Sequence, residues 1–347
     1  MADMTNGSST GNGWQDSLPV HEKYILLSVC LLIILVGVIG NASILLAVTR
    51  VREMRRPIYY CLTSLCISDT LVLLIIPVWP LTNLFQLRIM YGGQEFCHFA
   101  GFFDRGALVS SLLTVLVLSV DRYVAVCHPL RARQVLSKRT TMAVLCAIWG
   151  LSIAVSAPYA TMSAYYERVS DGVNVTLCGW DMHPWQLKYD TAVFCIFILV
   201  PMICLVVFNV LIVRTLLRTA KKTTSRSEHP GSHARRNRQV AFMVTGIVVS
   251  LWVCLLPTFI YQNLWKVCDL LQKVTGVCGN NITILRLSWF FRILVLMNSA
   301  GNPVIYSVVS SEFRAALRKA IRIYPGDRKP GMGHLDLAST RLTSSCA

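Results

Sequence analysis

Seven long apolar segments, separated by shorter polar connections, organise this sequence. The first, Ile25 to Leu46, carries no charge over about 22 residues, enough for a helix to cross about 30 Å of hydrocarbon. The other six are bounded by Ile58 and Leu84, Cys97 and Cys127, Met142 and Met162, Tyr189 and Leu217, Val240 and Leu264, and Leu285 and Val309. Because lipid offers the backbone no hydrogen-bond partners, segments of this length must be helical. The pattern predicts an all-α membrane protein, a seven-transmembrane helix bundle over residues 24–309.

Both ends of the chain depart from this pattern. Residues 1–23 are polar and rich in Gly, Ser and Asn, which predicts a disordered tail. Residues 310–324 mix apolar side chains such as Phe313 with basic ones such as Arg314 at helical spacing, which predicts a short amphipathic helix along the inner leaflet. Residues 325–347 are polar again and predict a second disordered tail, whose Ser and Thr residues are candidate phosphorylation sites.

Composition agrees with a polytopic membrane protein. The 347 residues are 54% hydrophobic and 14% charged, which is typical of membrane bundles and not of a soluble domain. The formal net charge of +16 could suggest nucleic acid as a partner. However, the basic residues lie between the apolar segments, where a membrane topology already accounts for them, so no nucleic-acid partner is predicted.

The distribution of positive charge predicts the orientation. Lysine and arginine concentrate at the cytoplasmic ends of membrane spans. Here they cluster after spans one, three and five, at Arg50, Arg52, Arg55, Arg56, Arg131, Arg133, Lys138 and Arg139 and between Arg214 and Arg238. The amino terminus is therefore predicted outside and the carboxyl terminus inside. The glycosylation sequons at Asn6, Asn174 and Asn281 then all fall on the extracellular side.

The cysteines divide into two groups. Most of the thirteen lie within apolar segments, where a cysteine is usually a small buried side chain. Cys97, Cys178, Cys268 and Cys278 fall in connections predicted outside, in the oxidising compartment. Four cysteines allow three pairings, and their spacing does not choose among them.

Short motifs in several of the spans carry a family resemblance. Asp121-Arg122-Tyr123 ends the third span and is followed by Pro129-Leu130, while Asn302-Pro303 and Tyr306 lie in the seventh. Further matches are Gly40-Asn41, the string Leu65 to Asp69, Trp149 and Pro201. Together these strings resemble the rhodopsin-like (class A) G-protein-coupled receptors over nearly the whole bundle. The resemblance implies a plasma-membrane receptor that activates a heterotrimeric G protein, and a disulfide between Cys97 and Cys178; a local Cys268–Cys278 bridge is a further option.

The resemblance also assigns switch residues. It implies that Arg122 is released to meet the G protein while Tyr306 swings inward, beside a helix loosened at Pro303, which cannot donate to the helix ladder. The residues it assigns to coupling and switching are Asp121, Arg122, Tyr123, Leu130, Pro257, Asn302, Pro303 and Tyr306. Three positions depart from the family pattern: Leu255 replaces a tryptophan, Asn209 a tyrosine, and Asn237 an acid that restrains Arg122. These departures leave the switching route and the basal activity open.

Asp69 is a lone carboxylate near the middle of the second span, where a charge is costly without a partner or an ion. In similar receptors this acid binds sodium, and Ser111, Asn298 and Ser299 match the positions that supply further oxygen ligands. A hydrogen-bonded polar cluster without an ion is the alternative. No other cofactor is predicted.

Asp104 leaves two ligand classes open. It lies near the outer end of the third span, at the position of the acid with which amine receptors hold a protonated nitrogen. Against an amine, Arg105 follows directly, Arg292 matches a position that faces the third span, and Val193, Phe194, Phe197 and Leu296 replace the polar residues of amine receptors. Asp104 and Arg292 could pair with each other.

A charged and aromatic set predicts a peptide ligand instead. Its members are Asp104, Arg105, Phe259, Tyr261, Gln262, Trp265, Trp289 and Arg292, beside a long polar connection at residues 266–286. The chain also resembles the thyrotropin-releasing hormone, ghrelin, neuromedin and invertebrate neuropeptide receptor group. The alternatives are a receptor for a biogenic amine and a constitutively active receptor.

Other classes of membrane protein fit the sequence less well. A transporter would be expected to show internal repeats or several charges along a path through the bundle. An enzyme would need a nucleophile with its base, or metal-ligand spacing, and neither is found. Receptor kinase and arrestin, acting on the Ser/Thr tail, and membrane lipid complete the predicted partners.

Overall fold

The computed structural model describes residues 18–54, 56–85, 93–128, 137–170, 173–180, 184–226, 232–275 and 281–322. Side chains are described in these ranges except at 79, 82–83, 93–94, 163–180, 220–237, 265–275 and 281. Within this part of the chain, seven helical segments are long and apolar enough to cross a membrane. The predicted seven-helix bundle is therefore confirmed.

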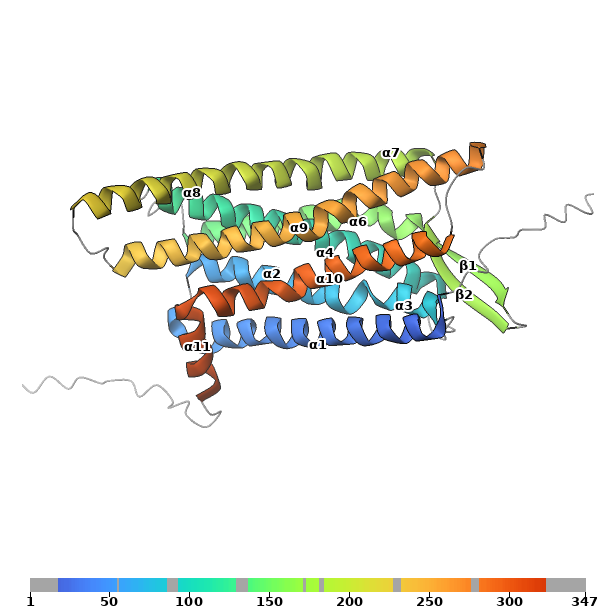
Figure 1. Cartoon of the computed structure of the whole chain (residues 1–347), viewed down its shortest axis with the longest axis horizontal. Coiled ribbons are helices and arrows are strands. Elements are labelled where there is room, and N and C mark those ends of the chain that lie inside the picture. The colour runs from blue at the N-terminus through green and yellow to red at the C-terminus, as the bar shows by residue number, and fades with distance from the viewer. Residues whose placement is uncertain are drawn as a thin grey trace, which may run out of the picture.

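The helices run roughly along one common axis (Figure 1). In chain order the helical elements are α1 (Val20–Arg50), η1 (Arg52–Met54), α2 (Pro57–Ile75), α3 (Val78–Leu84), α4 (Gly93–Cys127), α6 (Lys138–Met162), α7 (Pro184–Val193), η2 (Phe194–Leu199), α8 (Val200–Arg226), α9 (Ser232–Thr275), α10 (Asn281–Val309) and α11 (Ser311–Arg322). The amphipathic α11 turns away from the axis at one end, which we call the α11 end (Figure 1).

Two of the predicted spans are interrupted. The second was predicted as one segment to Leu84, but a turn at Ile76 and Pro77 divides it into α2 and α3. Proline lacks the N–H that a continuous ladder would need, which accounts for the break. The fifth span contains a π-helical turn, η2, immediately before Val200 and Pro201. The Val200 N–H reaches back five residues to Cys195 O, so one extra residue is accommodated next to the proline.

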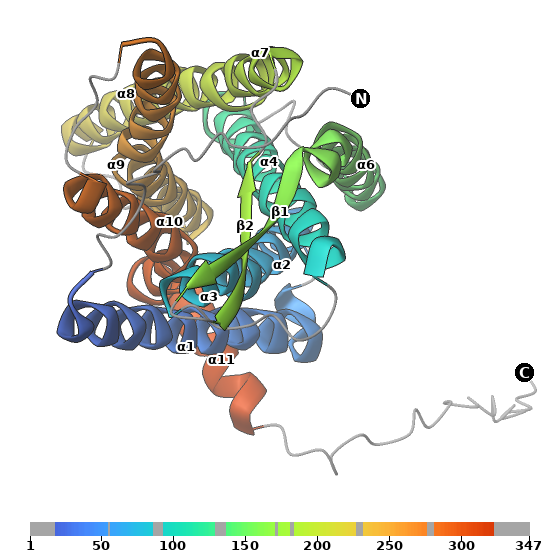
Figure 2. The same ribbon diagram turned by 90° about the vertical axis from the view of Figure 1, so that its right-hand side faces the viewer.

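A β-hairpin was not part of the all-α prediction. Strands β1 (Ser163–Ser170) and β2 (Val173–Trp180) pair antiparallel, with Ser163 opposite Trp180 and Tyr165 opposite Cys178. The hairpin lies across the end of the bundle opposite α11, where it contacts α3 and α4 (Figure 2). We call this the hairpin end. The pattern of apolar spans could not predict the hairpin because it lies in a polar connection.

The connection predicted at residues 266–286 is also largely helical. Helix α9 continues to Thr275, well past the predicted end at Leu264, and α10 begins at Asn281. Hydropathy marks only where a helix leaves the lipid, whereas backbone hydrogen bonding continues the helix into water.

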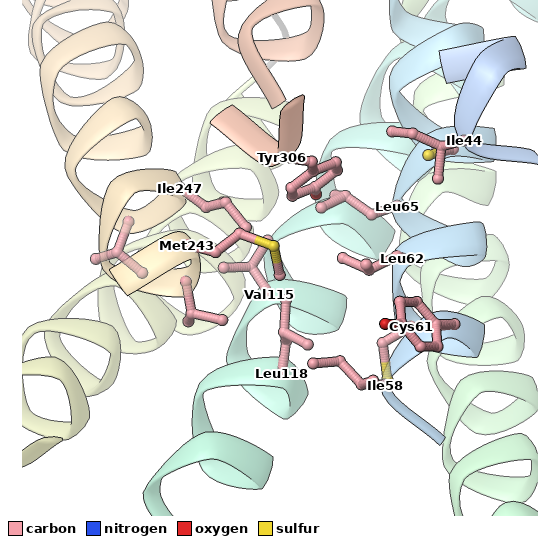
Figure 3. Close-up of a cluster of buried hydrophobic side chains, with 14 of the residues drawn as sticks. Ile44, Ile58, Cys61, Leu62, Leu65, Val115, Leu118, Met243, Ile247 and Tyr306 are labelled. Atoms are coloured by element: carbon pink, nitrogen blue, oxygen red, sulfur yellow. The ribbon is translucent and has the colours of Figure 1, made fainter. Parts of the chain in front are cut away.

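Among the described residues, the largest apolar cluster joins α1, η1, α2, α4, α6, η2, α8, α9, α10 and α11. In the close-up, Tyr306 of α10 lies beside Leu65 of α2 and close to Ile247 of α9 (Figure 3). A second cluster at the hairpin end places Leu18, which is 1% exposed, with Leu84 of α3 and Trp289 of α10. Large apolar side chains that face outward, such as Leu32 and Val253, are 62% exposed and suit contact with lipid.

Two glycines let α1 approach its neighbours closely. A Cβ on Gly40 would lie 2.7 Å from Pro303 Cβ, and one on Gly37 would lie 2.5 Å from Leu73 Cδ1. Small residues at helix contacts are how membrane helices pack tightly without a hydrophobic driving force between them. Gly40 and Pro303 are both part of the family motifs, so this contact fixes α1 against the region of α10 that carries Asn302 and Tyr306.

Candidate ligand-binding and signalling sites

The centre of the bundle holds a buried acid and amide. Asn302 Nδ2 donates to Asp69 Oδ2 over 2.8 Å, and the two residues are 2% and 1% exposed. Ser111, Asn298 and Ser299 are also buried, at 5%, 4% and 2% exposure. Among the described residues, Asp69 Oδ1, Asn302 Oδ1 and the Tyr306 hydroxyl have no hydrogen-bond partner. An unpartnered carboxylate oxygen in a buried polar cluster fits the donor chemistry of a hard cation.

Asp121 and Arg122 form an ion pair within α4 near the α11 end. Arg122 Nε donates to Asp121 Oδ2 over 2.7 Å, and Nη2 of the same guanidinium contacts the same oxygen. Both side chains are largely buried, at 12% exposure for Arg122 and 9% for Asp121. Because each charge compensates the other, Arg122 is held in place by its own neighbour in the sequence.

Other residues of the predicted switch, and the positions that depart from the family pattern, lie on several helices. Tyr123 packs against Phe208 of α8, with ring centroids 5.4 Å apart, and its hydroxyl lies 3.4 Å from His128 Nε2. Asn209 accepts a hydrogen bond from the Thr245 hydroxyl over 3.2 Å, joining α8 to α9. Leu130 lies outside the described residues, as does the side chain of Asn237. Leu255, at the position of the missing tryptophan, is 1% exposed in the main apolar cluster.

Helix α11 is attached to the first connection of the bundle. Lys319 Nζ donates to Glu53 Oε1 over 2.7 Å, and the Tyr59 hydroxyl lies 3.2 Å from Glu312 Oε2. The hydrogen bond from Lys319 is the main cause that lowers the pKa of the exposed Glu53 carboxyl below its ordinary value. Phe313, Ala316 and Ala320 are buried against the bundle. The apolar face of α11 is therefore committed to the protein, and its basic residues lie on the outside.

Charged side chains gather at the hairpin end. Arg105 Nη2 of α4 lies 3.7 Å from Asp190 Oδ1 of α7, and both side chains are 13% exposed. The Tyr159 hydroxyl of α6 donates to the same Asp190 oxygen over 2.8 Å. The Arg105 guanidinium also lies over the Tyr159 ring, 5.1 Å from its centroid. We call Arg105, Tyr159 and Asp190 the α4–α6–α7 cluster.

Asp104 is separate from this cluster. It is half-buried, and it makes no ion pair or hydrogen bond within the described part of the chain. The pairing considered between Asp104 and Arg292 is therefore not made as a direct contact, and Arg105 pairs with Asp190 instead.

The aromatic residues predicted beside these charges fall into two groups. The Tyr261 hydroxyl lies 2.7 Å from Ser288 Oγ, and its ring stacks on Phe291 with centroids 4.6 Å apart, so it joins α9 to α10. Gln262 is half-buried. In contrast, Phe259 and Trp289 are only 3% and 4% exposed and pack within apolar clusters. Their role as ligand contacts stays a prediction, and the side chain of Trp265 lies outside the description.

Only some of the residues predicted to form disulfides or to carry glycans lie in the part of the chain that the structure describes. Cys97 is 2% exposed and is disulfide-bonded. Cys178 lies in β2, which contacts α4, although its side chain is not described. The side chain of Cys268, together with Cys278 and Asn6, lies outside the described residues, and only the backbone of Asn174 and Asn281 is described. The glycosylation sites and the identity of the Cys97 partner stay predictions.

The sequence missed two residues that organise the hairpin end. Asp190 is an acid at the start of an otherwise apolar segment, and Tyr159 lies at the end of another. A lone acid within a span is itself a functional signal, so Asp190 could have been found. The pairing of Asp190 with Arg105 could not have been predicted, because the two residues are 85 positions apart in the chain and the hydropathy pattern fits many relative rotations of the two helices.

This arrangement of helices and charges is that of a seven-helix membrane receptor. The model of the family described as 7 transmembrane receptor (rhodopsin family) matches residues 40–306, and the chain belongs to that family. It is therefore a multi-pass receptor of the plasma membrane and not an enzyme.

Several curated proteins are similar over most of the chain. Growth hormone secretagogue receptor type 1 of Oryctolagus cuniculus is 26% identical over 324 residues, which cover 91% of this chain and 86% of that protein. Neuromedin-U receptor 1 of Homo sapiens is 28% identical over 327 residues, which cover 87% and 74%. Neuromedin-U receptor 2 of Mus musculus is 27% identical over 314 residues, which cover 88% and 75%.

Proposed function

We propose that this receptor binds a neuropeptide or peptide hormone at its hairpin end and activates a heterotrimeric G protein at its α11 end. The hairpin end and the amino terminus would face the outside of the cell, as the positive charges and the sequons predict. The similarity to growth hormone secretagogue and neuromedin-U receptors supports a ligand of the peptide class.

The observation that carries this proposal is the combination of Asp104 with other charged and aromatic side chains at the hairpin end. Asp104 of α4 makes no ion pair or hydrogen bond with the described residues, and no direct ion pair joins it to Arg292 of α10. A peptide presents amide groups, a charged or amidated end and side chains together, so one of its groups can pair with Asp104 while others contact further residues of the site. A small amine would satisfy Asp104 alone. Phe194, which packs against Phe259 with ring centroids 5.8 Å apart, offers such an amine no hydroxyl.

A receptor for a biogenic amine is the second candidate. The half-buried Asp104 carboxylate has no partner among the described residues, and a protonated amine would supply one. Leu296, which is 1% exposed, stands where amine receptors have a tyrosine that covers the nitrogen. We favour the peptide because both Arg292 and this missing tyrosine count against the amine.

Signalling would follow from a shift between two conformations of the bundle. Peptide binding stabilises a minor conformer in which the fifth, sixth and seventh spans, including α8, α9 and α10, rearrange and an inner cleft opens at Arg122. Arg122 would leave Asp121 to meet the G protein, and Tyr306 would leave its place beside Leu65. Sodium, held by Asp69 with Ser111, Asn298 and Ser299, would supply charge compensation at the centre of the resting bundle.

Further contacts belong to the same proposal. Cys97 would be joined to Cys178, tying the outer end of α4 to the hairpin, and Cys268 to Cys278. Asn6, Asn174 and Asn281 would carry glycans. The basic outer face of α11, including Arg318, would contact lipid headgroups, while receptor kinase and arrestin would act on the carboxyl-terminal tail.

The test is second-messenger release in cells that express the chain. Calcium and cyclic AMP are followed during challenge with a peptide library and, separately, a panel of biogenic amines. We expect a saturable response to one peptide family that is lost in Arg292→Ala and in Arg122→Ala at unchanged surface expression. Glu22→Gln, which breaks an exposed ion pair with Arg286 at the hairpin end, is the matched control and should leave the response unchanged. A response to amines alone, lost in Asp104→Ala, would overturn the peptide assignment.

A further inference from the structure

Helix α4 contains two places where an aspartate is followed directly by an arginine, and the two arginines make different contacts. In Asp121-Arg122 the arginine folds back onto the acid that precedes it. In Asp104-Arg105, seventeen positions earlier in the sequence, the arginine pairs with Asp190 of another helix, and Asp104 has no partner among the described residues. The first case demonstrates that adjacent Asp and Arg side chains on this helix can pair. The second therefore needs a reason why they do not.

The reason is the α4–α6–α7 cluster. Asp190 offers Arg105 a carboxylate at 3.7 Å, and Tyr159 fixes that carboxylate with a 2.8 Å hydrogen bond to the same oxygen. The Tyr159 ring adds a cation–π contact to the guanidinium at 5.1 Å. Arg105 thus has a compensating charge and an aromatic face, and neither comes from Asp104. Val109, Val155 and Val193 pack with the Tyr159 ring in one apolar cluster, which makes a charge left without a partner at this place costly.

We propose that Asp190 is a positioning residue for ligand recognition: by holding Arg105, it keeps the Asp104 carboxylate available for a cationic group of the ligand. This inference rests on the proposed function and adds to it the chemistry of the ligand, a peptide with a basic side chain or a free amino terminus. Without Asp190, we expect Arg105 to turn to Asp104, the acid beside it in the sequence, as Arg122 turns to Asp121. The site would then lose its free negative charge.

A positioning role for Asp190 can be distinguished from a purely structural role by one measurable difference. If the Arg105–Asp190 ion pair only bridged two helices, removing both charges would be at least as harmful as removing one. If Asp190 acts by holding Arg105, the harm comes from the released arginine, so a second change that removes the arginine restores the site. The variant pair Asp190→Asn and Arg105→Gln/Asp190→Asn separates the two roles.

The first measurement uses a probe peptide from the library. The probe is an amidated synthetic peptide with one basic group that gives a saturable response, and its analogue has that group acetylated or replaced by citrulline. For the basic probe, Asp190→Asn should raise the half-maximal concentration about tenfold or more. The reason is that Arg105 then occupies Asp104, so the basic group of the peptide loses its carboxylate partner. The double variant should return the half-maximal concentration to within about threefold of the original, and the neutral analogue should respond alike in all forms. Glu22→Gln serves again as the control ion pair at the same end.

The second measurement needs no ligand, so it remains decisive if the proposed function fails. Thermal denaturation of the purified receptor in detergent gives the shift in Tm caused by Asp104→Asn, once alone and once in the Asp190→Asn background. We expect a larger decrease in the Asp190→Asn background, because only there has Asp104 become the partner of Arg105.

The outcomes are distinct. No response to any peptide would contradict the proposed function, and the Tm comparison would still decide the inference. The inference is overturned if the Asp104→Asn shift is equal in the two backgrounds. It is also overturned if the double variant signals no better than Asp190→Asn, or if Asp190→Asn responds to the basic probe like the unmodified receptor.

Discussion

Asn302 donates a hydrogen bond to Asp69 across 233 positions of sequence, and this 2.8 Å contact ties α10 to α2 at the centre of the bundle. Only one carboxylate oxygen is used, and the other is buried without a partner among the described residues. A buried carboxylate with half of its hydrogen-bonding capacity unused is costly in a membrane. A cation at that oxygen would remove the cost, whereas a neutral, protonated acid would remove it without an ion.

We therefore predict a sodium effect that depends on Asp69. In detergent, replacing choline chloride by sodium chloride at equal ionic strength should raise the Tm of the receptor, because the ion binds only the folded state. Asp69→Asn should abolish the difference between the two salts. The control is Glu53→Gln, whose exposed carboxylate lies in η1 and should leave the sodium effect intact. Equal Tm values in both salts for the unmodified receptor would favour the hydrogen-bonded cluster without an ion.

Gly40→Ala should destabilise the receptor. The added Cβ would lie 2.7 Å from Pro303 Cβ and 2.9 Å from its Cγ, so α1 and α10 must separate. Overpacking of this kind costs about 1–3 kcal/mol, which corresponds to a decrease in Tm of several degrees. Gly150→Ala is the matched control, since nothing lies within 4 Å of its added Cβ. That variant should leave Tm unchanged or raise it slightly, because alanine favours the helix. Equal effects of the two substitutions would contradict the close contact.

Leu18 is predicted to stabilise the packing of the start of α1 against α3 and α10 at the hairpin end. It is 1% exposed and packs with Leu84 and Trp289, so Leu18→Ala should lower Tm. Truncation of a fully buried leucine costs about 2–5 kcal/mol, so the decrease in Tm should be several degrees. Val20→Ala, two residues later at a side chain that is 67% exposed, is the control. A loss no greater than that of Val20→Ala would indicate that Leu18 is not held in the cluster.

The contact between Glu53 and Lys319 should depend on pH. The pKa of the Glu53 carboxyl is lowered in the folded protein, chiefly by the hydrogen bond from Lys319. Its contribution to stability is therefore present above the unfolded pKa, about 4.3, and is lost as the pH falls through the folded value. The difference in Tm between the unmodified receptor and Glu53→Gln should be small at pH 7, because both side chains are exposed, and should disappear once the pH is below the folded pKa of Glu53. A difference that persists in acid would show that the glutamate acts through something other than its charge.

The sequence alone determined the seven spans, the amphipathic α11 and the family. These features follow from local rules: lipid requires apolar side chains over a fixed length, helical hydrogen bonds are made within each span, and motifs such as Asp121-Arg122-Tyr123 are contiguous. The predicted signalling residues Asp69 and Asn302 were also found this way, and the structure brings them together.

The tertiary structure alone decided which charges pair. Arg105 could have joined Asp104 beside it, as Arg122 joins Asp121, and hydropathy is the same in either case. It joins Asp190 because the packing of α4, α6 and α7 places that carboxylate and Tyr159 on one side of it. The β-hairpin, which lies in a polar connection, was likewise decided only by the tertiary structure. Pairing energies depend on which helix faces meet and at what distance, and these are set by side-chain packing between distant segments, which no local pattern records.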